Sequence, residues 1–455
     1  MTDLVTNVKC SITIILRDNT EISIQLNNDI NLKDLKNYIT AIDVNEDMCV
    51  QNNNPVGVVS SNTLKIELNS LDMSLFPENL VSVYHGLMDN TARINLKLDY
   101  IDGIVDFGTY YVSNWYSNIS SSNPYKVIIE ATDLLSIIGK NKVPSGIITQ
   151  NLSTKDAFIY MLDSLNKGLS NEYKIQYNEN NIDFSEFDKI EYDNLDTGDM
   201  SLWLNTISQC TLTNIYIDRN NEIKTDYCLD DANELSVATL SDKVNILNAS
   251  VDTAGLVKYT GVKTNYITNS INNMSKITSV GNQLLKPGVN VFDDINFGSK
   301  VFRVNAIRLM SAVSSKLEIS KIQYDKRNCS IEIINSNEED VECSIEIYGQ
   351  TLKENKLNFT AVKENSSNEI LEVNNILIMP EYVEKFTNGL VSLIGIRNSS
   401  LSLNGFFNPA IKLGDKVYID VSSSINTEGY YKVIGLQWKI GNTIKCTAKL
   451  IKTIV

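Results

Sequence analysis

The sequence predicts a mainly β protein, built as several β-barrel or sandwich domains with a small α/β insertion. Most of the chain consists of short runs in which apolar and polar residues alternate, the period of a half-buried strand. Helical spacing is confined to two places, residues 149–240 and a stretch after Pro380. We divide the 455 residues into an N-terminal β-rich domain (1–148), the α/β insertion (149–240), a β-rich middle domain (241–345) and a C-terminal β-domain with one helix (346–455).

The N-terminal region contains a hairpin and a series of further strands. Residues 12–16 alternate, "RDNTE" provides a turn, and residues 22–26 alternate back. Residues 64–68 continue the pattern. A strand at 107–116 is apolar on both faces, with Phe107, Tyr111 and Trp115 on one face and Tyr110, Val112 and Tyr116 on the other. Such a strand is either buried in a sandwich or covered by a partner, so we take 107–116 as a candidate contact site.

The insertion is expected to contain two helices and a hairpin. Ser153 and Asp156 have the spacing of a capping box. Ala157, Phe158, Met161, Leu162 and Leu165 then follow at helical intervals, and Gly168 suits the end of the helix. A second helix starts after Asp199 and buries Trp203, Ile207 and Cys210. The following segment, "TNIYIDRNNEIKTDY", predicts a hairpin folded at residues 219–221.

The C-terminal half returns to strands, interrupted by one helix. "KVFRVNAIRL", "CSIEII" and "CSIEIYG" predict short strands between residues 241 and 350. Pro380 is a favoured first-turn residue, and Val383, Phe386, Leu390 and Leu393 share the buried side of the helix after it. In "GFFNPAIKLGDKVYIDV", Asn408-Pro409 and Gly414-Asp415 form two turns that lead into a strand. Strands are expected at 415–421, 429–439 and 443–451.

The charge balance argues against two classes of partner. With 40 basic and 55 acidic residues the net charge is −15, which opposes binding to phosphate backbones or anionic membranes. No segment approaches the length of apolar chain that crosses a bilayer, and the N-terminus lacks the pattern of a signal peptide. We therefore expect no nucleic-acid partner and no membrane insertion by the chain itself. The seven cysteines are scattered without CxxC spacing, which indicates buried, reduced thiols in a protein made in the cytoplasm.

No motif indicates catalysis, a cofactor or a metal. His85 is the only histidine; it fits a turn beside Gly86 better than it fits a catalytic pair, which would need recognisable neighbours. Asp193, Asp196 and Asp199 lack the ligand spacing of a calcium loop, and Asp199 is better explained as a helix N-cap. "DRNNE" likewise fits a hairpin turn better than an ion site. We predict no catalytic, cofactor-binding or metal-binding residues and no enzymatic activity.

Two alternatives stay open. The 21 tyrosines suit subunit interfaces, where a ring with a polar tip is favoured, but they also suit stacking against sugars. A glycan-binding receptor module is thus one alternative. A cell-wall hydrolase with an unidentified carboxylate pair is the other, less favoured one.

Several segments, taken in order, resemble the hub and tail-tip proteins of bacteriophage tails and related contractile particles. In the N-terminal part they are "SSNTLKIELNSLDMSLFPENLVSVYHG", "FGTYYVSNW" and "YKVIIEATDLLSIIG". "WLNTISQ" and "IYIDRNNEI" resemble the small inserted domain of these proteins. "SIEIYGQTL", the helix after Pro380 and "NPAIKLGDKVYI" resemble their C-terminal part. Residues 255–345 have no counterpart in this resemblance.

The resemblance implies a tail-hub-like fold and a structural function. The chain would belong to the baseplate or tail tip of a phage or phage-tail-like bacteriocin, assembled in the cytoplasm of the bacterial host. Its partners would be other tail proteins and copies of itself, as a trimer first and a hexamer second. The ring so formed would join the tail tube to the outer baseplate, and heterologous contacts between sheets would close it.

Overall fold

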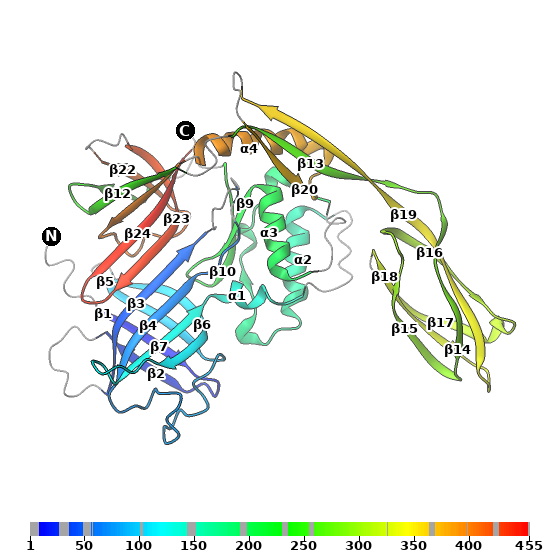
Figure 1. The fold of residues 1–455 in the computed structure, drawn as a ribbon, viewed down its shortest axis with the longest axis horizontal. Helices are drawn as coiled ribbons and strands as arrows, with labels where there is room; N and C mark the ends of the chain where they lie inside the picture. Colours follow the sequence, from blue (N-terminus) through cyan, green and yellow to red (C-terminus); the bar gives the residue numbers. More distant parts are fainter. Residues whose placement is uncertain are drawn as a thin grey trace.

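A computed structural model describes residues 9–26, 36–48, 56, 58–100, 103–142, 152–191, 198–229, 235–253, 259–324, 326–363, 369–397, 399–421 and 427–453. Figure 1 shows three parts side by side: a β-rich body, a central group of helices, and an elongated β arm. The predicted mainly β class with a small α/β insertion is confirmed.

The N-terminal part is a barrel of antiparallel strands. It contains β1 (Lys9–Ile15), β2 (Glu21–Gln25), β3 (Asn37–Asp47), β4 (Thr63–Ser70), β5 (Arg93–Tyr100), β6 (Gly103–Ser117) and β7 (Lys126–Thr132). The strand order is β3-β4-β7-β6-β5-β1-β2, and a bridge between Leu26 and Ile39 brings the end of β2 back to β3. The alternation of Ile12, Ile14 and Leu16 places these side chains in the core, as predicted.

The C-terminal strands extend the same sheet. They are β11 (Ala238–Ser241), β12 (Ile246–Thr253), β21 (Ser399–Gly405), β22 (Lys416–Asp420), β23 (Gly429–Ile440) and β24 (Ile444–Lys452). β23 pairs with β3 from Gly435 opposite Asp47 to Ile440 opposite Ile42, so the two ends of the chain share a 13-stranded sheet. One hydrophobic core runs through both parts and includes Trp438 and Phe107.

The α/β insertion packs against that sheet and carries a core of its own. Its helices are α1 (Leu134–Ile138), α2 (Thr154–Asn166) and α3 (Met200–Thr211), with one-turn helices at Asn171–Tyr173, Glu179–Asn181 and Ser185–Phe187. Its strands are β8 (Gln176–Tyr177), β9 (Thr213–Ile217) and β10 (Glu222–Tyr227). A later helix, α4 (Val383–Arg397), follows the turn Pro380–Tyr382, and its Phe386 and Leu390 pack in the same core.

The predicted helix starts are confirmed in position, but only one has a side-chain cap. The Ser153 side chain accepts a hydrogen bond from the Asp156 backbone N–H, as the capping box requires. Asp199 is the N-cap of α3, yet its side chain makes no capping hydrogen bond. The four predicted buried residues of α4 are all buried, from Val383 to Leu393.

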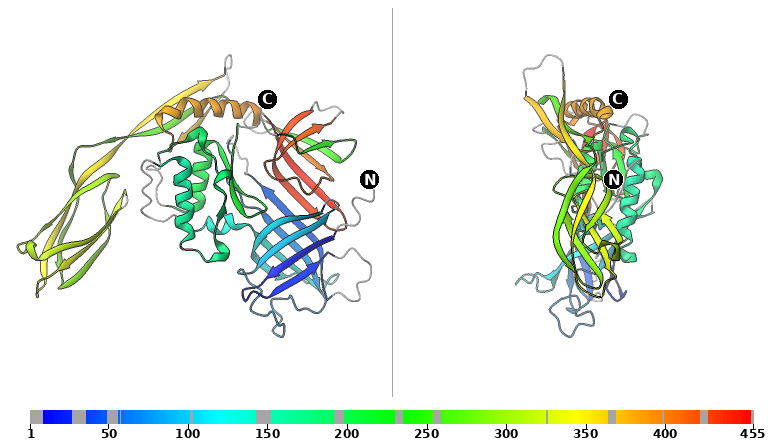
Figure 2. Two further views of the ribbon diagram at one scale, coloured as in Figure 1. Left: turned by 180° about the vertical axis from the view of Figure 1, so that it is seen from behind. Right: turned by 90° about the vertical axis from the view of Figure 1, so that its right-hand side faces the viewer.

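The arm is built on one long strand. β13 (Tyr259–Ile271), the half of β19 (Val341–Val362) from Leu352 onward, and β20 (Glu369–Asn375) form a three-stranded segment that we call the ribbon. The ribbon continues into a small sandwich. It is made of the first half of β19, up to Thr351, together with β14 (Ser275–Leu285), β15 (Gly288–Asn296), β16 (Val301–Met310), β17 (Leu317–Tyr324) and β18 (Asn328–Asn335), with a turn of helix at Ser314–Lys316. The sandwich has a separate core, and Figure 1 and the left view of Figure 2 show it projecting from the rest of the molecule.

The predicted faces of the strand at 107–116 are wrong. Phe107, Tyr110, Val112 and Trp115 all lie in the barrel core, whereas Tyr111 lies in the core of the insertion. The cause is two irregularities in the pairing of β6, one beside Gly108 and one between Val112 and Asn114. A β-bulge adds one residue and so exchanges the two faces for the later residues of the strand. The strand is therefore covered on both sides by its own chain, and the prediction that it is a contact site is corrected.

Two of the predicted domain limits separate strands that pair with each other or divide a single strand. The limit after residue 345 lies inside β19, and β12, which we assigned to the middle domain, pairs with β21 of the C-terminal part. Both differences arise from long-range strand pairing, which alternation along the sequence does not report.

Candidate functional site

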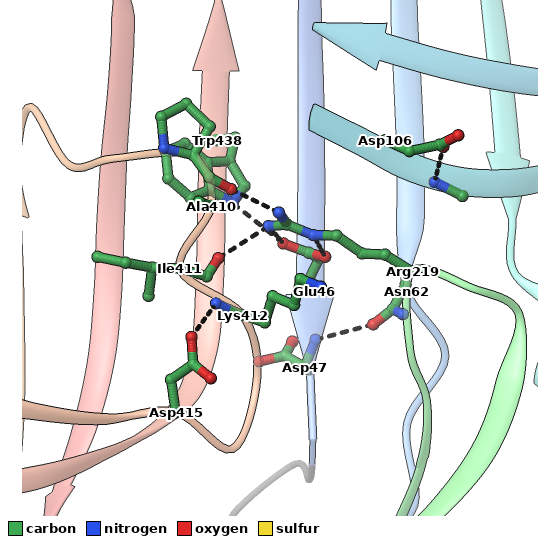
Figure 3. Close-up of polar contacts among 12 residues, drawn as sticks. Glu46, Asp47, Asn62, Asp106, Arg219, Ala410, Ile411, Lys412, Asp415 and Trp438 are labelled. Atoms are coloured by element: carbon green, nitrogen blue, oxygen red, sulfur yellow. Dashed lines mark hydrogen bonds and ion pairs between the residues drawn. The ribbon is translucent and has the colours of Figure 1, made fainter. Parts of the chain in front are cut away.

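The barrel, the insertion and the C-terminal strands meet at a buried arginine, Arg219. Arg219 lies in the tight turn between β9 and β10, where Asp218 accepts hydrogen bonds from the backbone N–H groups of Asn220 and Glu222 at 2.8 and 3.0 Å. A turn residue is ordinarily exposed, but the Arg219 side chain points into the molecule and is only 4% exposed. Figure 3 shows it crossing from the hairpin to the barrel strand that carries Glu46.

The guanidinium binds the Glu46 carboxylate through two parallel hydrogen bonds. Nε lies 2.7 Å from Oε1 and Nη2 lies 2.6 Å from Oε2. This fork is the strongest arrangement for such a pair. Nη1 and Nη2 also donate to the carbonyl oxygens of Pro409 and Ile411, at 2.5 and 3.1 Å. One side chain therefore ties the hairpin, the barrel and the C-terminal loop together.

Aromatic rings enclose this ion pair. The guanidinium carbon lies 4.2 Å from the ring centroid of Phe107, a cation–π distance. Trp438 donates from Nε1 to Glu46 Oε2 at 3.0 Å. Burial by itself lowers the pKa of Arg219, but the adjacent Glu46 carboxylate outweighs burial and the pKa is raised. Each partner satisfies the other, which offsets the cost of burying the two groups.

The loop that receives Arg219 is fixed by its own turns. Asn408 Oδ1 accepts a hydrogen bond from the Ala410 N–H at 2.9 Å, and Asp415 Oδ2 accepts one from the Lys412 N–H at 2.7 Å. Gly414 has φ of +86°, which favours glycine. The Asn-Pro and Gly-Asp turns singled out in the sequence therefore place the two carbonyl oxygens that Arg219 binds.

A second polar connection links the barrel to the insertion. The buried Asp133 carboxylate accepts hydrogen bonds from the backbone N–H groups of Asn62 and Leu135 at 2.7 and 3.0 Å. The Asn62 side chain then donates to the Ile217 carbonyl oxygen and accepts from the Asp47 N–H. Burial raises the pKa of Asp133 to about 7, against the opposing effect of the N–H donors.

We call the residues of these two connections the junction: Glu46, Asn62, Phe107, Asp133, Arg219, Pro409, Ile411 and Trp438. Most of the sequence segments that resemble tail proteins supply a residue to the junction or touch it. "WLNTISQ" adds Asn205, whose Oδ1 accepts a hydrogen bond from the Val59 N–H at 2.8 Å. Gly108 lies so close that an added Cβ would be 2.9 Å from the Arg219 carbonyl oxygen.

A cleft of about 510 Å³ opens beside the junction, lined by residues of β10, the hairpin turn and the 412–416 loop. Among its charged lining residues, Lys224 pairs with Asp218 at 2.8 Å within the hairpin, and Asp226 pairs at 2.5 Å with the buried Lys432 of β23. The second pair links β10 of the insertion to the C-terminal sheet. The arrangement therefore fixes the orientation of barrel, insertion and C-terminal sheet.

Of the residues considered for chemistry, "DRNNE" is the hairpin turn that carries Arg219, as predicted, and the others lie elsewhere. His85 lies in an exposed run of turns, with Nδ1 3.2 Å from the Pro77 carbonyl oxygen, and Gly86 beside it has positive φ; its interpretation as a turn residue is confirmed. Asp193 and Asp196 lie outside the described residues. Within the described ranges, no three His, Cys, Asp or Glu side chains are grouped as metal ligands, and no helix there is long and apolar enough to span a bilayer.

Six of the seven cysteines are described, and all six are buried and free of disulfides. Burial raises the pKa of the Cys10 and Cys210 thiols to about 12. The prediction of buried thiols is confirmed for these six. Cys49 lies outside the described residues.

Glu46 and Arg219 were not predicted as site residues. A signal for Glu46 was present: it falls in phase with Ile42 and Val44, so alternation places a carboxylate on the buried face of β3. Arg219 offered no such signal, because a charged residue in a polar turn looks like any exposed loop residue.

No protein-family model matches the chain, and no curated protein matches it in sequence. Solved structures do match in fold. A tail protein from Neisseria meningitidis MC58 has a TM-score of 0.56 at 8% identity, covering 97% of this chain and 96% of its own. The 43 kDa tail protein of prophage MuSo2 from Shewanella oneidensis has a TM-score of 0.51 at 7% identity, covering 97% and 98%.

A component of the type VI secretion system of E. coli also matches, with a TM-score of 0.40, 8% identity and coverage of 93% and 76%, a score too low to support an argument. The chain thus has the fold of phage tail proteins, and the predicted resemblance is confirmed at that level.

Proposed function

We propose that this chain is a non-enzymatic structural component of the tail tip or baseplate of a phage or phage-tail-like particle. The observation that carries the proposal is the extent of the fold match. It covers 97% of this chain and 96–98% of two tail proteins, so it includes body, insertion and arm together.

The junction supports a structural role. Its charged side chains bind one another and the backbone of neighbouring segments, through contacts of 2.5 to 3.1 Å. A buried, bidentate pair resists reorientation, since moving one partner leaves a charge uncompensated in the interior. Such a body would transmit force between neighbouring subunits without changing shape.

In this proposal the chain forms a ring-shaped hub that joins the tail tube to the outer baseplate, with trimer preferred over hexamer. The ring lies in the virion tail and assembles in the host cytoplasm. Mass photometry of the purified protein over a range of concentrations tests the ring, and electron microscopy of particles lacking the gene tests the role. We expect a closed oligomer and tailless or tipless particles. A protein that stays monomeric, together with intact particles after deletion, would refute the proposal.

The purified protein also tests the two alternative functions. Specific binding on a glycan array would favour a receptor-recognition module of the same particle. Clearing of cell walls in a zymogram, abolished by replacement of one carboxylate pair, would show a hydrolase.

A further inference from the structure

Among the described residues, the ribbon half of β19 has a neighbouring strand on one side only. From Leu352 to Val362 it pairs with β13. On its other side β16 pairs with β19, but that pairing ends with Val301 opposite Thr351. In the described part of the chain, no strand pairs with this side of β19 beyond Thr351.

Two hydrogen bonds fix which backbone groups point to the unpaired side. The Leu352 N–H donates to Lys300 on the β16 side, and the Lys363 N–H donates to Thr260 on the β13 side, both at 2.8 Å. Backbone groups alternate in direction along a strand. The even-numbered residues of the stretch therefore direct N–H and C=O groups to the side without a strand: Glu354, Lys356, Asn358 and Thr360. All four are exposed. We call this the open edge.

The open edge and the far edge of the ribbon carry opposite charges. Lys353 and Lys356 are exposed on the strand that forms this edge, β19, and the only carboxylate between Leu352 and Val362, Glu354, is held by Lys300 at 2.7 Å. β20, which forms the other edge, carries Glu369 and Glu372 and no basic residue. Glu372 is 61% exposed and forms an ion pair with Lys263 of β13 at 2.7 Å. Lysines on an edge repel basic strands and admit acidic ones.

We propose that the open edge of β19 binds β20 of a second copy of this chain as an added antiparallel strand. The inference rests on the proposed ring and names the surfaces that would close it. β13 is antiparallel to β19 and parallel to β20, so β19 and β20 are antiparallel within one chain. Rotation about an axis along the strands preserves these directions. Such a rotation therefore places β20 of one copy beside β19 of the next copy, with the two strands antiparallel. The contact joins two different surfaces, so it is heterologous and can close into a ring.

Amide hydrogen exchange of the full chain tests the contact directly. In the monomer, the odd-numbered amides from Lys353 to Phe359 are protected by β13, whereas those of the open edge face solvent. On assembly the open-edge amides should slow by at least about tenfold, because they gain strand partners. Open-edge amides that exchange equally fast in ring and monomer would overturn the contact and leave the ring itself standing.

Charge reversal identifies the partner strand. The variant Lys353→Glu with Lys356→Glu, and the variant Glu369→Lys with Glu372→Lys, should each lose the oligomer in mass photometry. The chain carrying all four changes should regain it, since the edges are then complementary again. Lys316→Glu with Lys321→Glu, the same charge change on exposed arm residues, is the matched control and should assemble normally.

Thermal unfolding confirms that each variant is folded. The assignment of these edges would be overturned if both charge-reversed variants formed the oligomer at wild-type concentrations. It would also be overturned if the variant with all four changes did not regain the oligomer. A wild-type chain that remains monomeric at every concentration would overturn both this contact and the ring.

Discussion

Arg219 and Glu46 are an unusual pair at the scale of single residues, because both side chains are almost fully buried, at 4% and 3% exposure. Replacing Arg219 with Met leaves the Glu46 carboxylate buried without its cation. We expect the free energy of unfolding, measured in urea, to fall by about 3–5 kcal/mol. The double change Arg219→Met with Glu46→Leu should lose less than Arg219→Met alone, since no charge remains uncompensated.

The matched control is the exposed pair Lys97 with Asp106, whose side chains are 55% and 54% exposed and 3.9 Å apart. Lys97→Met should cost less than about 1 kcal/mol. Equal losses for the buried and the exposed pair would show that the junction does not hold the body together.

Asp133 makes stability depend on pH. Burial raises its pKa from 3.8 to about 7 in the folded chain, so folding favours the protonated form. Its contribution is therefore fully present below about pH 4 and is lost as pH rises to about 7, by up to about 4 kcal/mol. Asp133→Asn removes the titrating group. The unfolding free energy of the wild type should fall relative to that of the variant between pH 4 and 7.5, and parallel pH curves would contradict this account.

At the scale of elements, α2 shows how a local signal acts. The Ser153 hydroxyl oxygen accepts a hydrogen bond from the Asp156 N–H at 3.0 Å and so satisfies one of the free N–H groups at the helix start. Ser153→Ala should lower the unfolding free energy by about 1 kcal/mol. Ser164→Ala, in the last turn of the same helix, should cost nothing, because alanine is the better helix former. A similar loss at both positions would refute the cap.

β6 shows where element-scale patterns fail. Its residues from Phe107 to Trp115 follow no single alternation, since pairing irregularities shift the faces. Gly108 has φ of +89° and approaches the Arg219 backbone closely. The glycine was visible in the sequence, but the bulge depends on strand β5 and on the hairpin turn, which lie elsewhere in the chain.

At the scale of the whole molecule, the sandwich at the end of the arm packs separately from the body. Its core shares no buried residue with the two cores of the body, and it joins the ribbon where Ile271 lies opposite Leu352. Residues 272–351 can therefore be replaced by Asn-Gly, a two-residue hairpin turn. We expect the shortened chain to fold and to keep the main thermal transition of the body. Loss of that transition would show that the arm stabilises the body.

Much of the fold was predictable from local patterns. The hairpin at residues 12–26, the helix capped by Ser153, the helix after Pro380 and the turns at Asn408 and Gly414 were all predicted from spacing and turn chemistry. These signals act between residues a few positions apart. The resemblance to tail proteins rested on the order of such segments, and the fold match supports it.

Only part of the candidate site could be predicted from the sequence. The sequence by itself determined the hairpin at residues 12–26, the helices after Ser153, Asp199 and Pro380, and the two turns of the 408–415 loop, because alternation, capping and backbone preference are local properties. Only the tertiary structure decided that β23 pairs with β3, that Arg219 reaches Glu46 across 173 residues of chain, and that β19 keeps one open edge. Each of these depends on strand pairing and charge burial between distant segments, which no spacing along the chain encodes.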